Sequence, residues 1–297
     1  MIFANKKLTV KASLVLGMMS GTSLDGLDLA LCRFFEEGET QFELIAGQTI
    51  PYPAPWQERL KHLMNLNGAA LMEEDAALGK WMGEQAAAFL KSKQLHCELI
   101  GSHGHTVFHR PDLGFSTQIG NGAHIAVQTG IPVVCDFRST DIALGGQGAP
   151  LVPLGDRELF GKYEVCLNIG GIANWSGEIG RERKASDIAP ANMVFNFLAE
   201  RLGKPYDANG EMAAGGKLIP GLLKELNELS FYRVDGPKSL GREWFEESFL
   251  PLLNTYQEPT ENLLRTCVEH CAQQIAYSLR SIEKGTVFIT GGGAYNH

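Results

Sequence analysis

Residues 15–34 read VLGMMSGTSLDGLDLALCRF, with two apolar runs at 15–19 and 27–34. Apolar runs of this length on either side of Gly and Asp predict two strands joined by a tight hairpin. Gly21 and Gly26 allow backbone N–H groups to approach a ligand closely, as in anion-binding nests. An ordinary hairpin needs only one Gly and one Asx residue, so the additional polar groups favour a phosphate-binding turn over a purely structural one.

The same turn carries the side chains of a phosphate and metal site. Ser20, Thr22 and Ser23 offer hydroxyl groups, while Asp25 and Asp28 could hold Mg²⁺ directly or through its waters. The turn is not a Walker loop, because no Gly-Lys-Ser/Thr follows it. A hairpin that wraps phosphates without a lysine is typical of the actin-like ATPase architecture of sugar kinases and heat-shock chaperones. That architecture repeats a hairpin-led domain, so a second hairpin is expected.

Residues 165–176 (VCLNIGGIANWS) predict this second hairpin, about 150 residues after the first, which is the spacing of domain-sized units. Residues 287–296 (VFITGGGAYN) then predict a strand that runs into three glycines, where a nucleotide base or ribose could lie against bare backbone. The nucleotide-binding candidates of these two segments are Asn168, Gly170, Gly171, Gly291, Gly292, Gly293 and Asn296.

Length and composition predict an α/β enzyme of two lobes. A chain of 297 residues exceeds the size at which one core usually divides, so we expect a first lobe at 1–136 and a second at 137–297. The glycine-rich passage 144–153 predicts a loop or hinge between the two halves. A net charge of −8 argues against nucleic acid or an anionic membrane as the main partner. No run approaches 18 apolar residues, so no membrane span is predicted.

The remaining periodicity alternates between helices and strands. Apolar spacing predicts helices at 56–66, 71–93, 192–202 and 262–282, and short strands at 98–102 and 132–137. The six cysteines lie in apolar segments without a CxxC pair, which predicts buried free thiols in a reducing compartment. Cys267 and Cys271 fall on the apolar face of the last helix and are expected in the core rather than as ligands.

Two groups of residues are candidates for chemistry. Asp187, in SDIAPAN, is expected to be the base near the acceptor, and its alternative role is a simple helix N-cap. Asp136 could accept sugar hydroxyls and Arg138 could bind a substrate carboxylate, with Asp141 nearby. For this second group the alternative is structural ion pairing across the hinge.

The chain resembles the anhydro-N-acetylmuramic acid kinases from residue 14 to its last residue. The motifs that carry the resemblance are GMMSGTSLDGLD (17–28), SHGHTVFHRP (102–111), QIGN (118–121), DFRSTDIALGGQGAPLVP (136–153), LNIGGIANWS (167–176), DIAPAN (187–192), GKPYD (203–207), PKSLGREWF (237–245) and TGGGAYN (290–296). The first and fourth are the most specific.

The resemblance implies an ATP- and Mg²⁺-dependent reaction on 1,6-anhydro-N-acetylmuramic acid in the bacterial cytoplasm, as part of peptidoglycan recycling. Water opens the anhydro bridge with Asp187 as base, and the freed 6-oxygen takes the γ-phosphate to give N-acetylmuramic acid 6-phosphate. The ATP-binding residues carried over by motif are Gly21, Thr22, Ser23, Leu24, Asp25, Gly26, Leu27 and Asp28. The sugar-binding candidates are His103, Gln118, Asn121, Asp136, Arg138 and Asp141.

The resemblance also implies the actin-like two-domain fold, with duplicated mixed sheets flanked by helices and a cleft between the lobes. Relatives continue beyond residue 297, so the first lobe is expected to lack its C-terminal elements, and the activity of this chain by itself is left open. The oligomeric state is left open as well, with a homodimer as one candidate. His105 stands where many relatives have Gln, and both side chains can hydrogen-bond a sugar.

Two other functions compete with the kinase. His103 and His105, with His109 and His124 nearby, could form a metal-dependent hydrolase site at a strand end. An actin-like regulator that binds ATP without catalysis is the third reading, and it predicts no use for Asp136 and Arg138. Sugar-dependent ADP formation separates the kinase from both alternatives.

Overall fold

The computed structural model describes residues 12–21, 24, 26–35, 41–180, 182–234, 236–280, 282 and 285–296. Its contacts divide the chain into two compact units, Met1–Leu151 and Val152–His297. This division lies inside the glycine-rich passage, so residues 137–151, expected in the second lobe, pack with the first unit. Three of the expected nucleotide contacts, Thr22, Ser23 and Asp25, lie outside the described residues.

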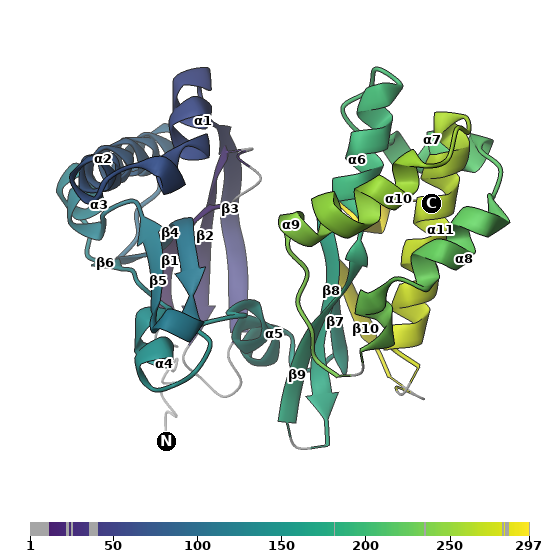
Figure 1. The fold of residues 1–297 in the computed structure, drawn as a ribbon. Coiled ribbons are helices and arrows are strands. Elements are labelled where there is room, and N and C mark those ends of the chain that lie inside the picture. Colours follow the sequence, from purple (N-terminus) through teal and green to yellow (C-terminus); the bar gives the residue numbers. More distant parts are fainter. Residues whose placement is uncertain are drawn as a thin grey trace, which may run out of the picture. The chain divides into compact units, whose positions relative to one another are not determined.

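The first unit is a mixed sheet with helices α2 and α3 on one face (Figure 1). Its strands follow the order β3-β2-β1-β4-β5, with β6 beside β4, and β1 pairs antiparallel with β2 but parallel with β4. The strands are β1 (Ala12–Ser20), β2 (Gly26–Phe35), β3 (Gln41–Pro51), β4 (Leu99–Arg110), β5 (Phe115–Ile119) and β6 (Val133–Val134). The helices are α1 (Ala54–Lys61), α2 (Gly68–Ser92), α3 (Gly122–Thr129) and α4 (Ser139–Ala143).

The predicted first hairpin is confirmed as β1 and β2, paired from Ala12↔Phe35 to Ser20↔Leu27. Alternate residues of β2, Leu27, Leu29 and Leu31, are buried because successive strand side chains point to opposite faces. Gly26 is required at its position, since a Cβ there would lie 2.3 Å from the Ile50 carbonyl oxygen on the neighbouring strand. The first core therefore forms between this hairpin and α2.

The second unit repeats this strand arrangement with different helices. Its order is β10-β7-β8-β9, with β7 antiparallel to β8 and parallel to β10. The strands are β7 (Val165–Ile169), β8 (Ile172–Ile179), β9 (Glu182–Pro190) and β10 (Val287–Thr290). The helices are α5 (Val152–Phe160), α6 (Asn192–Arg201), α7 (Glu211–Gly215), α8 (Pro220–Asn227), α9 (Arg242–Trp244), α10 (Leu250–Asn254) and α11 (Thr260–Ser278). The predicted α/β architecture of two hairpin-led mixed sheets flanked by helices is confirmed.

Two of the predicted strands have other lengths. The strand expected at 98–102 continues to Arg110 as β4, so His103 and His105 lie within it rather than at its end. The strand expected at 132–137 is only Val133–Val134, because the backbone turns at Asp136, which has φ of 57°. A left-handed backbone ends a strand, and Asp tolerates it better than most residues.

The cysteine prediction is correct for four residues and wrong for two. Cys97, Cys166, Cys267 and Cys271 are buried, and the last two lie in the core of the second unit as expected. Cys32 is half-buried and Cys135 is exposed, because it follows the short strand β6 into an irregular segment. No described helix has both the length and the apolar character needed to cross a membrane.

Candidate active site

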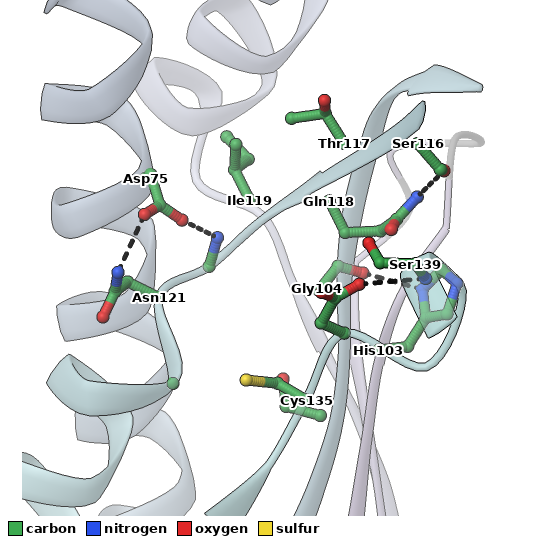
Figure 2. Close-up of a pocket in the computed structure, with 14 residues that line it drawn as sticks. Asp75, His103, Gly104, Ser116, Thr117, Gln118, Ile119, Asn121, Cys135 and Ser139 are labelled. Atoms are coloured by element: carbon green, nitrogen blue, oxygen red, sulfur yellow. Dashed lines mark hydrogen bonds between the residues drawn. The ribbon is translucent and has the colours of Figure 1, made fainter. Parts of the chain in front are cut away.

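The first unit contains a cavity of about 240 Å³ between β4, β5, the start of α3 and the segment 135–139. Figure 2 shows side chains from these elements and from α2 around it. The lining residues are Asp75, Ser102, His103, Gly104, Ser116, Thr117, Gln118, Ile119, Gly120, Asn121, Gly122, Cys135, Asp136 and Ser139. Four of the six expected sugar-binding residues, His103, Gln118, Asn121 and Asp136, are therefore brought together.

Arg138 contacts the cavity through His103. Its Nη2 and Nε lie 2.8 and 3.2 Å from His103 Nε2, and its Nη1 donates to the Gly148 carbonyl at 2.7 Å. His103 Nδ1 lies 3.0 Å from the Gly104 carbonyl, which assigns the proton to Nδ1 and the lone pair to Nε2. Burial lowers the pKa of His103 and the Arg138 guanidinium lowers it further, so the imidazole is neutral at pH 7. Arg138 thus fixes both the orientation and the tautomer of His103.

The ion-pair alternative for this cluster is wrong. Among the described residues no ion pair joins Arg138 to Asp136 or Asp141. Asp136 Oδ1 instead accepts the Ser139 N–H at 3.3 Å, and Asp141 Oδ2 accepts the Gly148 N–H at 2.7 Å. Asp141 does not line the cavity. Its hydrogen bond to Gly148 fixes the conformation of the glycine-rich passage, so its role is in the shape of that loop.

Asn121 is held at both ends of its amide. Its Nδ2 donates to Asp75 Oδ2 at 2.9 Å, while its Oδ1 accepts from the first N–H groups of α3. Asp75 Oδ1 accepts the Gly120 N–H at 2.9 Å, and both Asp75 contacts are visible in Figure 2. Gly79 permits this approach, because a Cβ there would lie 2.5 Å from the Asn121 carbonyl oxygen. Asn121 therefore builds the cavity wall, with both groups of its amide already engaged.

Gln118 is the amide with free bonding capacity. Its Nε2 donates to Ser116 Oγ at 2.7 Å (Figure 2), and its Oε1 accepts no hydrogen bond within the described residues. This side chain lies on β5 beside His103 of β4 in the cavity lining. A ligand hydroxyl could donate to Gln118 Oε1 without displacing a protein partner.

Asp75 lines this site, although no sequence motif indicated it. Asp75 lies on α2 at helical spacing from the buried residues Leu71, Leu78 and Met82, so a carboxylate stands on the apolar stripe of the helix. A charge on a buried stripe is a signal of a specific partner, because an unpaired buried carboxylate is costly. That signal was present in the sequence, although it does not identify Asn121 as the partner.

The end of the first hairpin is held by a buried hydrogen-bonded chain. Tyr52 OH donates to Ser20 Oγ at 2.6 Å, and Ser20 Oγ lies 2.8 Å from His105 Nδ1. Burial lowers the pKa of His105 to about 4, so the ring is neutral. Because Ser20 Oγ already accepts from Tyr52, the Ser20 hydroxyl is assigned as the donor to His105 Nδ1. The His105 ring is buried and is not among the residues that line the cavity, so we assign it no contact with the sugar.

Both histidines of the alternative metal site are thus committed elsewhere. His103 Nε2 accepts from Arg138, and His105 Nδ1 accepts from Ser20. In the part of the chain that the structure describes, no group of three His, Cys, Asp or Glu side chains could hold a metal ion. A cationic guanidinium against the imidazole lone pair is incompatible with metal binding there, and the hydrolase reading loses its site.

Asp28 is the described carboxylate of the expected Mg²⁺ pair. It is exposed near the start of β2, and Oδ1 accepts the Thr49 hydroxyl at 2.5 Å. An exposed carboxylate is the oxygen donor that Mg²⁺ prefers, and in nucleotide sites Mg²⁺ takes one or two carboxylates with phosphate oxygens and water. Asp28 therefore fits the expected ion, and its expected partner Asp25 lies outside the described residues.

The second hairpin and the glycine triplet meet at one place in the second unit. The N–H groups of Ala191 and Asn192, at the start of α6, donate to the carbonyls of Gly171 and Gly170 at 2.9 and 3.0 Å. A Cβ on Gly291 would lie 2.5 Å from the Ile169 carbonyl oxygen, and one on Gly293 would lie 2.3 Å from Ile169 Cγ2. These glycines thus have a packing role in addition to the expected nucleotide contact.

Asp187 lies on β9 opposite Asn174 of β8, and it is bound by the segment 236–241. Its N–H donates to the Lys238 carbonyl at 2.8 Å, and its Oδ2 accepts the Leu240 N–H at 2.7 Å. The cap alternative is wrong, because α6 begins at Asn192 with Ala191 as N-cap and no side-chain cap. Burial raises the pKa of Asp187, and the hydrogen bond from Leu240 partly opposes that rise. Such a carboxylate is a better proton acceptor than an exposed one.

Comparison with known proteins places the chain in one family. The family model described as "Anhydro-N-acetylmuramic acid kinase" matches residues 13–297. A glucokinase structure from Streptomyces griseus is a distant match, with 13% identity, a TM-score of 0.35, and coverage of 95% of this chain and 83% of that one. The protein named anhydro-N-acetylmuramic acid kinase in Pseudomonas putida is 41% identical over 96% of this chain and 81% of its own length. That in Pseudomonas fluorescens is 39% identical with the same coverage, and that in Acaryochloris marina is 37% identical over 95% and 82%. The resemblance is confirmed, and the chain belongs to the anhydro-N-acetylmuramic acid kinase family.

Proposed function

We propose that this chain is a kinase that uses ATP and water to convert 1,6-anhydro-N-acetylmuramic acid into N-acetylmuramic acid 6-phosphate and ADP. Membership of the family supports the phosphotransferase class and the sugar substrate. The observation that carries the proposal is the Asp187 carboxylate, which one backbone N–H orients and whose pKa burial raises. This combination suits a base that must be ionised at working pH and still accept a proton.

The chemistry assigned to Asp187 is proton removal from the attacking water. The water oxygen forms a bond to the anomeric carbon as the bond from that carbon to the bridging 6-oxygen breaks. Asp187 takes one water proton, and the freed 6-oxygen attacks the γ-phosphorus of ATP, releasing ADP. Asp187 Oδ1 accepts no protein hydrogen bond within the described residues, so it is the oxygen assigned to this proton.

The sugar is assigned to the cavity of the first unit. Gln118 Oε1 and the Asp136 carboxylate can accept hydroxyl protons there, and Arg138 keeps His103 neutral and oriented. A cavity of about 240 Å³ is slightly smaller than most ligand pockets, which favours a single sugar unit over a larger ligand.

The nucleotide is assigned to the turn between β1 and β2 and to the glycines at 170–171 and 291–293. Asp28, together with Asp25, would hold Mg²⁺, which when bound neutralises phosphate charge during transfer. A cytoplasmic location in bacteria, implied by the resemblance, belongs to the same proposal.

The test is a coupled assay of ADP formation with ATP, Mg²⁺ and the anhydro sugar. We expect ADP only when all three are present, with one equivalent of sugar 6-phosphate per ADP. In ¹⁸O-water the label is expected at the anomeric hydroxyl and not at the phosphate. Nucleotide binding without sugar-dependent ADP would favour the regulator, and label in the released phosphate would mean that water attacks ATP instead of the sugar.

A further inference from the structure

The segment 236–241, between the short helical turn Ser230–Arg233 and α9, is bound along its backbone to β9. Lys238 accepts the Asp187 N–H through its carbonyl, and its own N–H donates to Ser186 Oγ at 3.1 Å. The Ser186 hydroxyl donates to the Asp187 carbonyl at 3.0 Å and also lies 3.3 Å from the Lys238 carbonyl. Two residues later, Leu240 donates the hydrogen bond that holds Asp187 Oδ2. The segment thus contacts the proposed base at two of its atoms.

The side chain of Lys238 attaches this segment to the rest of the unit. Its Nζ donates to the carbonyls of Phe231 and Val234 at 2.9 and 3.0 Å and lies 4.4 Å from the centre of the Phe231 ring. Phe231 packs against Trp244 and Tyr232, with ring centres 5.3 and 5.2 Å apart. The ammonium group therefore anchors a segment that contains two glycines and would otherwise have much conformational freedom.

The anchor extends into the core through Tyr232. Tyr232 OH lies 2.9 Å from Nε2 of the fully buried His270 on α11, and His270 Nδ1 lies 2.8 Å from Asn227 Oδ1 on α8. Burial lowers the pKa of His270 to about 3, so this network stays neutral over the pH range of catalysis. The aromatic residues that receive Lys238 are thus held by two helices.

We infer that Lys238 is a positioning residue for Asp187, anchoring the segment whose Leu240 N–H orients the carboxylate. The inference rests on the proposed function, in which Asp187 is the base. A simpler role exists, since an ammonium on the last carbonyls of a helical turn also caps that turn. A cap would affect stability only, whereas a positioning residue also affects the rate and its pH dependence.

The cap and the positioning role predict different effects on Asp187 when the segment 236–241 is no longer anchored. Without the Leu240 hydrogen bond, the ionised carboxylate loses a donor, so the pKa of Asp187 rises. The acidic limb of the pH profile, where the base becomes protonated and the rate is lost, then moves to higher pH. Lys238 is the titratable residue of the segment, and Asn174, opposite Asp187 on β8, carries no charge. Replacement of Lys238 by an uncharged residue removes both its charge and its anchoring contacts, so a second variant must loosen the segment without changing any charge.

The experiment measures kcat, KM and the pH profile of kcat for Lys238→Met, Lys238→Arg and Ser186→Ala. Lys238→Met removes anchor and charge, Lys238→Arg keeps both, and Ser186→Ala loosens the segment without any change of charge. We expect Lys238→Met and Ser186→Ala to lower kcat about tenfold and to move the acidic limb up by about one pH unit, with both KM values unchanged. Lys238→Arg should keep most of the parent rate. Lys224→Met, which removes an exposed lysine from α8, is the matched control.

Two results would overturn the inference, and a third changes which variant tests it. Parent-like rates and profiles in both Lys238→Met and Ser186→Ala would overturn the inference. A shifted limb in Lys238→Met alone would also overturn it, because the effect would then come from charge. Loss of folded structure in Lys238→Met leaves Ser186→Ala as the test.

A separate readout keeps this inference distinct from the proposed function. The pKa of the Asp187 carboxyl can be followed by carbon NMR, with Asp187→Asn identifying the resonance. If Asp187→Asn keeps the parent rate, the proposed function fails at its base, whatever Lys238 does. In that case an unchanged carboxyl pKa in Ser186→Ala would overturn the positioning role as well, whereas a raised pKa would support it.

Discussion

The sheets of the two units share one strand arrangement but hold their hairpins by different means. In both, a third strand pairs antiparallel with the hairpin and a later strand pairs parallel with its first strand. The first hairpin ends in side-chain hydrogen bonds, from Tyr52 to Ser20 and from Ser20 to His105. The second is held by backbone bonds from α6 and by glycines packed against Ile169. One strand arrangement is therefore compatible with two ways of holding a hairpin. We call the hydrogen bonds among Tyr52, Ser20 and His105 the polar lock, and the packing of Gly291 and Gly293 against Ile169 the steric lock. Each should be weakened by different substitutions.

The units also divide the proposed chemistry. The cavity assigned to the sugar is built on β4 and β5 of the first unit, whereas the proposed base lies on β9, the third strand of the second. Substitutions in the first unit should then change KM for the sugar, and substitution of Asp187 should change kcat. Substitutions in each unit can therefore test this division and the two ways in which the hairpins are held.

The largest effect is expected for Asp187→Asn. This change keeps the size of the side chain but removes the proton acceptor, so kcat should fall by about 10²–10⁴ with both KM values nearly unchanged. Steady-state kinetics measure it, and Glu182→Gln, an exposed carboxylate at the start of the same strand, is the control. A variant that keeps more than about a tenth of the parent rate would show that the base is another residue.

The steric lock of the second hairpin is tested by Gly291→Ala. The new Cβ would lie 2.5 Å from the Ile169 carbonyl oxygen, at a position where φ is 86°. Overpacking and left-handed strain together should lower the free energy of unfolding by about 1–3 kcal/mol, measured by urea denaturation. Gly292→Ala is the matched control, since its Cβ would meet only Asn192 Nδ2 at 3.4 Å. Equal stabilities of the two variants would contradict the packing role.

The polar lock of the first hairpin is tested by Ser20→Ala. Loss of this hydroxyl leaves the buried Tyr52 OH and His105 Nδ1 without their shared partner, which should cost about 1–3 kcal/mol of unfolding free energy. Tyr52→Phe is the smaller companion change, because it leaves the bond between Ser20 and His105 intact. If Ser20→Ala unfolds at the same denaturant concentration as the parent, the hydrogen-bonded chain does not stabilise the hairpin.

The smallest effect is the part of the pH dependence of stability that comes from His105 of the first unit. The pKa of His105 is about 4 in the fold and near 6.5 when unfolded, so the unfolded state binds more protons as pH falls. Stability is therefore lost between about pH 6.5 and 4, and the loss from pH 7 to 5 should be about 1–2 kcal/mol.

His105→Gln isolates this term, because glutamine can still accept from Ser20 but does not titrate. Unfolding free energies of parent and variant at pH 7 and 5 give the difference, in which the contribution of His270 in the second unit cancels. Equal losses of stability in the two proteins would mean that His105 is not the titrating group.

Local sequence determined the two hairpins, the glycine triplet and the helices at 71–93, 192–202 and 262–282, to within a few residues. Strand and helix periodicity, with Gly and Asx at the turns, act between residues close in the chain, and these are the signals that a single sequence contains. The same local signals singled out Asp187, His103 and Asp136 and, through the motifs, the family. These signals predicted the strand at 132–137 too long and the strand at 98–102 too short. The ends of β4 and β6 depend instead on the strands beside them.

Only the tertiary structure decided which partner each polar side chain takes. Asp75 meets Asn121, Arg138 meets His103, and Leu240 meets Asp187, pairs separated by 46, 35 and 53 residues in the chain. Each pairing follows from burial: a half-buried polar group needs a hydrogen-bond partner, and the packing of helices on the sheet determines which one is within reach. The sequence alone thus determined that a carboxylate stands at 187, and the fold decided that it is held by a backbone N–H rather than capping a helix.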